Sequence, residues 1–266
     1  LFFMANPRPD IYVLSLKTAE KRREAVRKSL DMFQLPFQFV DAPDFRTLAP
    51  EEGQKYYKPT KKALKKQRFL QNTEIACALG HQHIYKIISE GKSPFALILE
   101  DDAFFLQDPR PLLHALPKIE AATGFDVLLL AYVKLLEKDL SYHYRRLPIR
   151  RCYRWENFYF GTPWQQFSAG TVAYVITREA AKKLLSSPIR VTADDWLYYE
   201  RHLGLNIYHM RPLIALENVS AFASDIRKER ENFLHIKPSS RMIRSLKGWA
   251  KNFLLTLDFK KGSKKS

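Results

Sequence analysis

Short apolar runs alternate with longer amphipathic segments along the first part of the chain. Residues 11–16 and 37–42 are apolar and rich in β-formers, which predicts two buried strands. Between them, residues 18–33 place Val26, Leu30 and Phe33 on one face, which predicts a helix. A strand, a helix and a second strand in this order indicate the opening of a parallel α/β sheet.

The same pattern continues to about residue 210. Residues 72–90 form a strongly amphipathic segment that Thr73 could cap and Gly91 ends, which predicts a long helix. Residues 141–160 are aromatic and basic with weak periodicity, which predicts a long loop or lid. The remaining predicted elements are strands over 95–99, 125–132, 171–177 and 205–210, and helices over 178–186 and 194–203. We therefore expect one α/β domain over residues 1–226, with a mostly parallel central sheet flanked by helices.

The chain carries a large positive charge, which indicates an anionic partner. Its 44 Lys and Arg exceed its 28 Asp and Glu, giving a net charge of +16. Residues 55–68 hold seven cations and no anion, which is typical of a solvated loop or an exposed helix. Residues 227–266 hold 12 cations against three anions and form a separate basic tail.

Within that tail, apolar residues recur at helical spacing with cations between them. Ser239 or Ser240 could cap the predicted helix. Its apolar positions are Met242, Ile243, Leu246, Trp249, Ala250, Phe253, Leu254 and Leu257, and its cations are Arg241, Arg244, Lys247 and Lys251. Such a helix either lies in an anionic membrane surface or docks on the protein's own core. The apolar run over 125–136 is too short to span a bilayer, so we expect a soluble or peripheral protein.

Other features limit the class of protein. With 46% apolar residues the chain can form a sizeable core. Two cysteines, Cys77 and Cys152, exclude a disulfide scaffold and a multi-cysteine zinc site, and they suit a reducing cytoplasm. We find no zinc spacing, RNP-like aromatic pattern or helix-turn-helix signature, so nucleic acid is not the expected partner.

Three consecutive carboxylates, Glu100, Asp101 and Asp102, follow the predicted strand 95–99 directly. They repel one another unless a cation neutralises them. Glu100 and Asp102 project to the same side if the strand continues. They also stand at the carboxyl end of a strand, where open α/β sheets bind ligands. Oxygen ligands favour Mn²⁺ or Mg²⁺. The alternative is a solvated acidic turn.

Five blocks of sequence, in order, resemble one protein family. They are IYVLSL with Arg22 and Arg23, FVDA at 39–42, TEIACALGH at 73–81, LILEDD at 97–102, and GTVAYVIT at 170–177 followed by AAKKLL at 180–185. Over residues 11–226 the chain resembles family 25 glycosyltransferases of bacterial lipooligosaccharide and lipopolysaccharide biosynthesis. It has Thr73, Ala76 and Gly80 where the family usually has two glycines and a serine.

The resemblance implies a GT-A-like fold, a nucleotide-sugar donor that is often UDP-galactose, and a role for the acidic block like that of a DxD motif. Asp102 would then coordinate Mn²⁺, and Glu100 would bind the metal through water or hold the ribose. Asp101 would support the site or touch the sugar. Asp194 or Asp195, before a short predicted helix, would be the base that takes the acceptor hydroxyl proton in an inverting transfer. One of this pair could instead simply cap the helix.

The resemblance implies further contacts to the donor. Ser15 would lie near the nucleoside, Arg22 and Arg23 near phosphate, and Ser224, with Ser220 and Asp225, on a loop that returns to the phosphates. His81 is either a core histidine or a ligand, and a metal role for Glu217 is open.

The predicted activity is transfer of galactose or glucose from a UDP-sugar to a lipid-linked oligosaccharide. The enzyme would work in the cytoplasm, peripheral on the inner face of the membrane. Alternatives are a metal-dependent nucleotidyltransferase or nuclease, a basic nucleic-acid-binding protein, and a non-catalytic scaffold.

Overall fold

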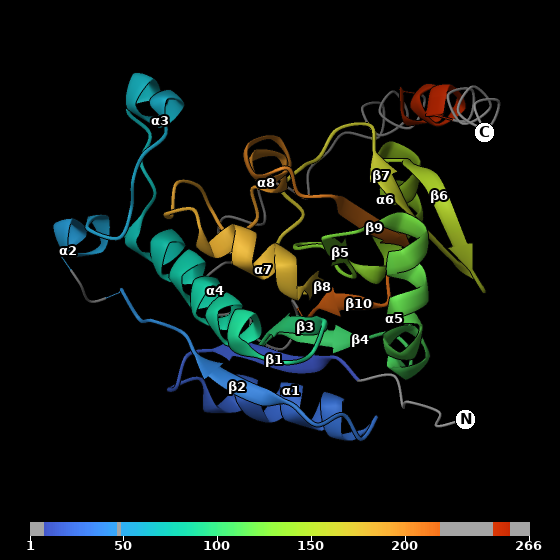
Figure 1. Cartoon of the computed structure of the whole chain (residues 1–266), viewed down its shortest axis with the longest axis horizontal. Coiled ribbons are helices and arrows are strands. Elements are labelled where there is room, and N and C mark those ends of the chain that lie inside the picture. Colours follow the sequence, from blue (N-terminus) through green and yellow to red (C-terminus); the bar gives the residue numbers. More distant parts are fainter. Residues whose placement is uncertain (1–7, 47–48, 219–246, 256–266) are drawn as a thin grey trace.

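The computed structural model describes residues 8–46, 49–218 and 247–255, and its centre is an eight-stranded sheet (Figure 1). The strand order is β2-β1-β3-β8-β5-β9-β7-β6. The strands are β1 (Asp10–Ser15), β2 (Gln38–Asp41), β3 (Phe95–Glu100), β5 (Val127–Leu129), β6 (Ile149–Trp155), β7 (Phe158–Pro163), β8 (Ala173–Thr177) and β9 (Ile207–Arg211). A second, two-stranded sheet pairs β4 (Ala103–Phe105) with β10 (Ala215–Glu217).

Helices flank this sheet. They are α1 (Glu20–Asp31), α2 (Pro50–Gln54), α3 (Lys61–Lys66), α4 (Asn72–Glu90), α5 (Arg110–Thr123), α6 (Leu140–Arg146), α7 (Arg178–Leu185) and α8 (Trp196–Leu203), with a 3₁₀ turn η1 (Glu137–Asp139). A further helix covers residues 247–255. The architecture confirms the predicted α/β class with a large central sheet.

Six of the eight strands run in one direction, and only β7 and β8 run in the other. Strands β1, β3, β5 and β9 therefore end at the same edge of the sheet. Because β8 is antiparallel to both β3 and β5, it begins at that edge. The loop before β8 is thus placed beside the end of β3.

The core lies on both faces of the sheet because side chains of a strand alternate between the faces. In β3, Leu97 and Leu99 pack into one cluster with Leu30 of α1 and Leu116 of α5. Their neighbour Ile98 packs into the opposite cluster with residues of α4 and α7. This double burial explains why β3 is apolar throughout.

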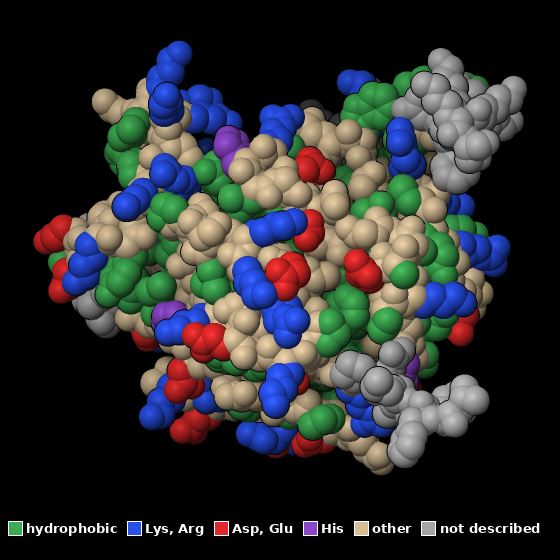
Figure 2. All heavy atoms as spheres, viewed as in Figure 1, with side chains coloured by type: hydrophobic (Ala, Val, Ile, Leu, Met, Phe, Trp, Pro, Cys, Tyr) green, Lys and Arg blue, Asp and Glu red, His purple; other side chains and the backbone are tan. Residues whose placement is uncertain are grey.

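Helix α4 begins and ends where the hydrophobic pattern predicted, but its cap is different. Gln71 is the N-cap, and Glu74 accepts a hydrogen bond from the Gln71 backbone N–H at 2.9 Å. Thr73, which we expected to cap the helix, lies inside its first turn, so that prediction is wrong. The basic segment 55–68 contains α3, whose Lys side chains project at the top left of Figure 2, as expected for an exposed helix.

Two parts of the predicted architecture need correction. Residues 141–160 are not a loop: they form most of α6 and a hairpin of β6 and β7 that extends the main sheet. The side chains of this hairpin are mostly only partly buried, so apolar and polar positions do not alternate clearly along its two strands. The last predicted strand, over 205–210, corresponds to β9, and a further strand that was not predicted, β10, follows it.

The C-terminal helix 247–255 lies next to the β7 and α6 side of the molecule (Figure 1). Gly248 packs so closely on the Arg145 carbonyl group that a Cβ there would overlap it. The rest of the predicted tail helix and the domain boundary at residue 226 lie outside the described residues. Within the described part of the chain, no helix combines the length and apolar character needed to cross a bilayer.

Candidate active site

The acidic block stands at the end of β3, directly beside the end of β1. Leu14 of β1 is in register with Glu100, so Ser15 is the next residue at the same edge. Asp101 and Asp102 form a turn that leads into β4. The structure therefore brings the predicted residues of β1, α1 and β3 into one place.

Arg22 contacts two of the three carboxylates at once. Its Nη1 donates to Asp101 Oδ1 at 2.8 Å, and its Nη2 donates to Asp102 Oδ2 at 2.9 Å. Ser15 Oγ donates to the other Asp101 oxygen at 2.7 Å. Burial raises the pKa of Asp101 even though Ser15 and Arg22 oppose that shift. Asp101 thus anchors Ser15 and Arg22 at the end of the sheet.

Arg23 joins the ends of β1 and β2. It donates to the backbone oxygens of Ser15 and Leu16 at 3.0 and 3.1 Å and forms an ion pair with Asp41. Its guanidinium also lies over the Phe39 ring, 4.8 Å from the centroid. Of the two predicted phosphate contacts, Arg23 is therefore tied to the sheet, whereas Arg22 is tied to the carboxylates.

Asp102 is the most perturbed carboxyl group of the block. Burial and the negative charge of Glu100 raise its pKa to about 7, with smaller contributions from Glu217 and Asp101, while Arg22 opposes the shift. Its Oδ1 atom is buried and has no hydrogen-bond partner among the described residues. Glu217 comes near because it pairs with Ala103 across the β10–β4 sheet. A buried oxygen without a partner amid excess negative charge fits a bound cation.

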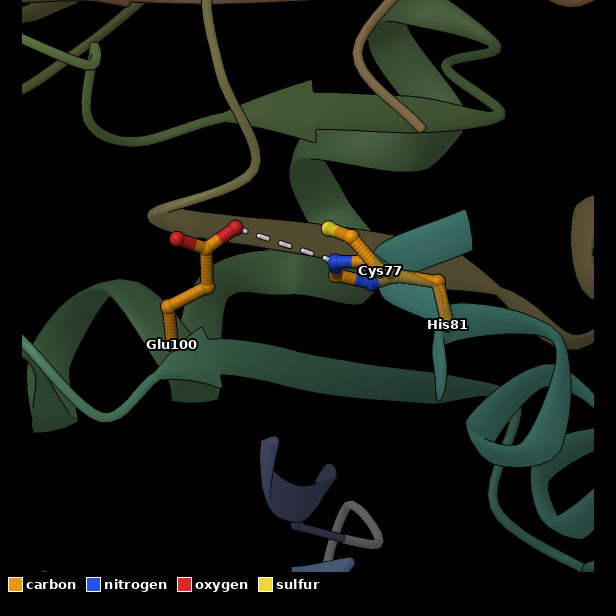
Figure 3. Close-up of side chains that lie close together, drawn as sticks. All are labelled: Cys77, His81 and Glu100. Carbon is orange, nitrogen blue, oxygen red and sulfur yellow. Dashed lines mark ion pairs between the residues drawn. The ribbon is translucent and has the colours of Figure 1, made fainter. Parts of the chain in front are cut away.

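The Glu100 side chain points toward His81 of α4 (Figure 3). It accepts a hydrogen bond from the Thr171 hydroxyl group, and His81 Nε2 lies 3.8 Å from its Oε1. Although burial acts to raise the pKa of Glu100, the neighbouring His81, Thr171 and Arg22 lower it below its usual range. Glu100 thus stays ionised at neutral pH.

His81 and Cys77 follow each other by one turn of α4, and their donor atoms lie with a Glu100 oxygen within 4.8 Å of one another. His81 Nδ1 is 2.8 Å from the Tyr174 hydroxyl group, but its Nε2 has no hydrogen-bond partner in the described structure. Burial, followed by the charges of Glu100 and Asp194, raises the pKa of the Cys77 thiol. One ring nitrogen of His81 therefore contacts the core residue Tyr174, and the other faces Glu100 of the acidic block.

The two aspartates before α8 have different environments. Asp195 is the N-cap of α8, and its side chain accepts a hydrogen bond from Tyr198 N at 3.0 Å. The side chain of Asp194 has no hydrogen bond or ion pair within the described part of the chain. Asp194 is half-buried, and its charge reaches Cys77 and Tyr199. The structure thus gives the capping role to Asp195 and leaves the carboxylate of Asp194 available.

The loop before β8 connects this helix to the acidic block. Trp196 is fully buried and donates from Nε1 to the Gly170 carbonyl oxygen at 3.1 Å. The next residue, Thr171, holds Glu100. Gly170 has φ +81° and packs against Val133 where a Cβ would clash, so this position requires glycine. Gly170 and Thr171 belong to the sequence block 170–177 that resembles the family. The hydrophobic pattern, however, did not predict that they contact Trp196 and Glu100.

A family model described as glycosyltransferase family 25 (LPS biosynthesis protein) matches residues 8–197, which include the acidic block and both aspartates. The chain belongs to glycosyltransferase family 25. It is thus an enzyme of the lipopolysaccharide-biosynthesis type of glycosyltransferase, as the five sequence blocks predicted.

Three proteins similar to this family 25 member come from two bacteria and a frog. It is 23% identical to the lacto-N-neotetraose biosynthesis glycosyltransferase LgtE of Neisseria meningitidis serogroup B, over 89% of this chain and 87% of the relative. It is also 23% identical to the lipooligosaccharide biosynthesis protein lic2B of Haemophilus influenzae, over 85% of each. Procollagen galactosyltransferase 1-A of Xenopus laevis is 27% identical over 73% of this chain and 31% of that protein.

Within this family 25 chain, the predicted donor residue Ser224 lies outside the described residues, as do Ser220 and Asp225. Glu217 was only an open candidate in the sequence, and the structure places it beside Asp102 with its Oε2 accepting from Lys134 N at 2.6 Å. In the sequence, only the family resemblance drew attention to this position.

Proposed function

We propose that the enzyme transfers a hexose, galactose or glucose, from a UDP-sugar to the oligosaccharide of a lipooligosaccharide or lipopolysaccharide acceptor. The observation that carries this proposal is the buried Asp102, which lies among Glu100, Glu217 and Asp101 and has one oxygen with no hydrogen-bond partner in the described structure. Family membership supports the reaction class. The name of the procollagen relative supports galactose as the first donor to test.

Mn²⁺ or Mg²⁺ is the proposed cofactor. Asp102 would hold it directly, and Glu100 would bind it through water. When bound, such an ion neutralises the diphosphate of the donor. Arg22 is one-third exposed and already lies against Asp101 and Asp102, so it is placed to bind a donor phosphate oxygen as well.

Asp194 is the proposed base of an inverting transfer. Its carboxylate takes the proton of the acceptor hydroxyl group while that oxygen attacks the anomeric carbon. The bond from the anomeric carbon to the donor phosphate oxygen breaks, and UDP leaves with the electron pair. Asp195 remains the reserve candidate, but its bond to Tyr198 N occupies it as a helix cap.

We further propose that the enzyme works peripherally on the cytoplasmic face of the inner membrane, next to a lipid-linked acceptor. In helix 247–255, Gly248 and Leu255 pack on the protein, whereas Trp249, Phe253 and Leu254 are exposed. The docked and membrane-facing alternatives are therefore compatible, because they use different sides of the helix. Each cation near an anionic surface contributes about 1 kcal/mol.

A donor-hydrolysis screen across UDP-, GDP-, ADP- and CMP-sugars, with and without Mn²⁺, tests this function. We expect hydrolysis of UDP-galactose or UDP-glucose that depends on the metal. Hydrolysis of a GDP-, ADP- or CMP-sugar instead would show that the proposed UDP-sugar donor is wrong. Activity with no sugar nucleotide, together with tight binding to DNA, would favour a nucleic-acid-binding protein, and cleavage or extension of nucleic acid would favour a nuclease or nucleotidyltransferase.

A further inference from the structure

A cavity of about 240 Å³ lies between α6, β6, the end of β9 and the C-terminal helix. Its described lining includes Arg145, Arg151 and Arg211 and no acidic residue. The other lining residues are Tyr144, Pro148, Ile149, Trp249 and Asn252. Because β9 ends at the same edge as β3, Arg211 lies at the acidic block's edge of the sheet, roughly three strand spacings or 14 Å from the end of β3.

Arg211 is buried, with 7% of its surface exposed, yet it has no carboxylate partner among the described residues. Its guanidinium donates to the Tyr132 hydroxyl group and, at 2.9 Å, to the Met210 carbonyl oxygen. It also lies over the rings of Tyr132 and Tyr144, 4.8 and 4.7 Å from their centroids. A buried charge is costly unless an opposite charge compensates it. Neutral groups thus hold Arg211 in place, and the described residues do not supply that anion.

The titratable groups that the structure describes around Arg211 do not supply this negative charge either. Burial and the positive charges of Arg211 and Arg146 lower the pKa of His143 to about 3. Burial and Arg211 also lower the pKa of His209 well below its usual value. Arg145 and Arg151, at the mouth of the cavity, have no ion pair in the described structure either. The cavity is thus a positively charged site with a preformed, buried donor.

The surface beside the cavity is apolar. In the helix 247–255, the exposed fractions of Trp249, Phe253 and Leu254 are 72%, 58% and 47%. Hydrophobic and basic side chains gather at this upper right part of the face in Figure 2. Trp and cations together at one surface are typical of a protein that contacts the membrane–water interface.

We propose that this cavity binds the phosphate of an anionic phospholipid headgroup. Arg211, Arg145 and Arg151 bind the phosphate oxygens while Trp249 and Phe253 enter the interface. This inference deepens the proposed membrane association and rests on it for the choice of a lipid as the source of the phosphate. The volume is below the ~300 Å³ of sites for drug-sized ligands, which suits a headgroup rather than a whole lipid.

Binding of the full chain to phosphatidylglycerol vesicles, with phosphatidylcholine vesicles as the reference, tests the proposal. We expect Arg145→Gln with Arg151→Gln to weaken binding to the anionic vesicles at least tenfold, since each cation near such a surface contributes about fivefold. The matched control is Lys61→Gln with Lys62→Gln on α3, which removes the same charge and should leave binding within about twofold. Equal losses in the two double variants would overturn the proposal in favour of general electrostatic attraction.

Arg211→Gln should also weaken vesicle binding, and its circular dichroism shows whether it folds. If it does not fold, the two exposed arginines carry the test alone. A blue shift of tryptophan fluorescence on vesicle binding, absent in Trp249→Phe, would support insertion beside the cavity. Binding of inorganic phosphate by the cavity without any vesicle binding would overturn the lipid source and leave a site for a soluble anion.

Hydrolysis of the sugar nucleotide is the separate readout. In the arginine variants it should stay at the level of the unaltered enzyme, because none of the three arginines contacts the acidic block. Failure of the proposed function would abolish hydrolysis in the unaltered enzyme, whereas failure of the lipid site would change only vesicle binding.

Discussion

The indole of Trp196 donates a hydrogen bond to the backbone oxygen of Gly170 at 3.1 Å. Through this bond the helix that follows Asp194 is fixed to the loop whose next residue, Thr171, holds Glu100. Two hydrogen bonds, Trp196 to Gly170 and Thr171 to Glu100, therefore connect the segment of the candidate base to the acidic block, although the two are far apart in sequence.

Trp196→Phe removes that hydrogen bond and retains most of the apolar volume. We expect the free energy of unfolding to fall by about 1–2 kcal/mol, because the Gly170 carbonyl group is left without its partner. We expect turnover to fall more than donor affinity, since the helix after the base loses its fixed position. Denaturant unfolding and steady-state kinetics measure the two effects. Unchanged turnover would show that this bond serves stability alone.

Asp102→Asn should abolish transfer, because it removes the proposed direct ligand of the cation. The comparison with Glu24→Gln, on the exposed surface of α1, controls for the loss of one negative charge. Near-wild-type activity of the Asp102 variant in Mn²⁺ would show that Asp102 is not a ligand of the metal.

The same variant should be more stable than the wild-type protein at high pH in the absence of metal. The pKa of Asp102 is about 7 in the folded protein against 3.8 for an ordinary aspartate. The folded state therefore binds the proton more tightly, and stability is lost as the pH rises from about 4 to 7. The difference corresponds to at most about 4 kcal/mol. Melting curves at pH 4 and pH 8 should show a gain for Asp102→Asn only at pH 8.

Metal binding should depend on pH for the same reason. A cation binds the ionised Asp102, so its proton competes with Mn²⁺ below pH 7. We expect the apparent Kd for Mn²⁺ to rise as the pH falls from about 8 to 6, and binding should release protons. Calorimetry in buffers of different ionisation enthalpy measures that release. A Kd that does not change over this range would contradict the assignment.

Asp194→Asn should lower turnover by about 10²-fold or more, the usual effect of losing a general base. Donor affinity should change little. Asp195→Asn is the matched comparison: it retains a good N-cap residue, so turnover and stability should change little, whereas Asp195→Ala should lose about 1 kcal/mol of stability. A larger turnover defect in Asp195→Asn would exchange the two roles, and a pure donor-binding defect in Asp194→Asn would move that residue to the nucleotide site.

Deletion of residues 239–266 should abolish binding to anionic vesicles but leave turnover of a soluble acceptor. The deletion also exposes the surface that Gly248 and Leu255 cover, so a small loss of stability is expected. Vesicle sedimentation and thermal melting separate the two effects. Complete loss of folding would mean that the tail serves only as part of the core.

The sequence predicted the elements whose side chains have one dominant environment. Strand β3 is apolar because both faces are buried, and α4 has a clear stripe and a clear end at Gly91. The β6–β7 hairpin was missed because its turn has φ +51° at Glu156, a residue that gives no turn signal, and its strands are half-buried. Helix α5 received no prediction; it contains Pro117, which normally argues against a helix interior.

The site was predictable to a similar extent. Consecutive carboxylates after a buried strand are visible in the sequence, and so is the Asp194–Asp195 pair. The contact between Arg22 and two carboxylates, the approach of Glu217 to Asp102, and the cavity at Arg211 depend on strand order, which local sequence does not contain.

The reversed strand β8 also has a consequence for synthesis of the protein. It separates β3 from β5 in the finished sheet, yet it is translated after both. Until residue 177 leaves the ribosome, these two strands have no partner between them, and each presents an unpaired, apolar edge. We expect chains that stop before β8 to aggregate rather than form a smaller enzyme, and the acidic block to assemble only after translation has passed this strand.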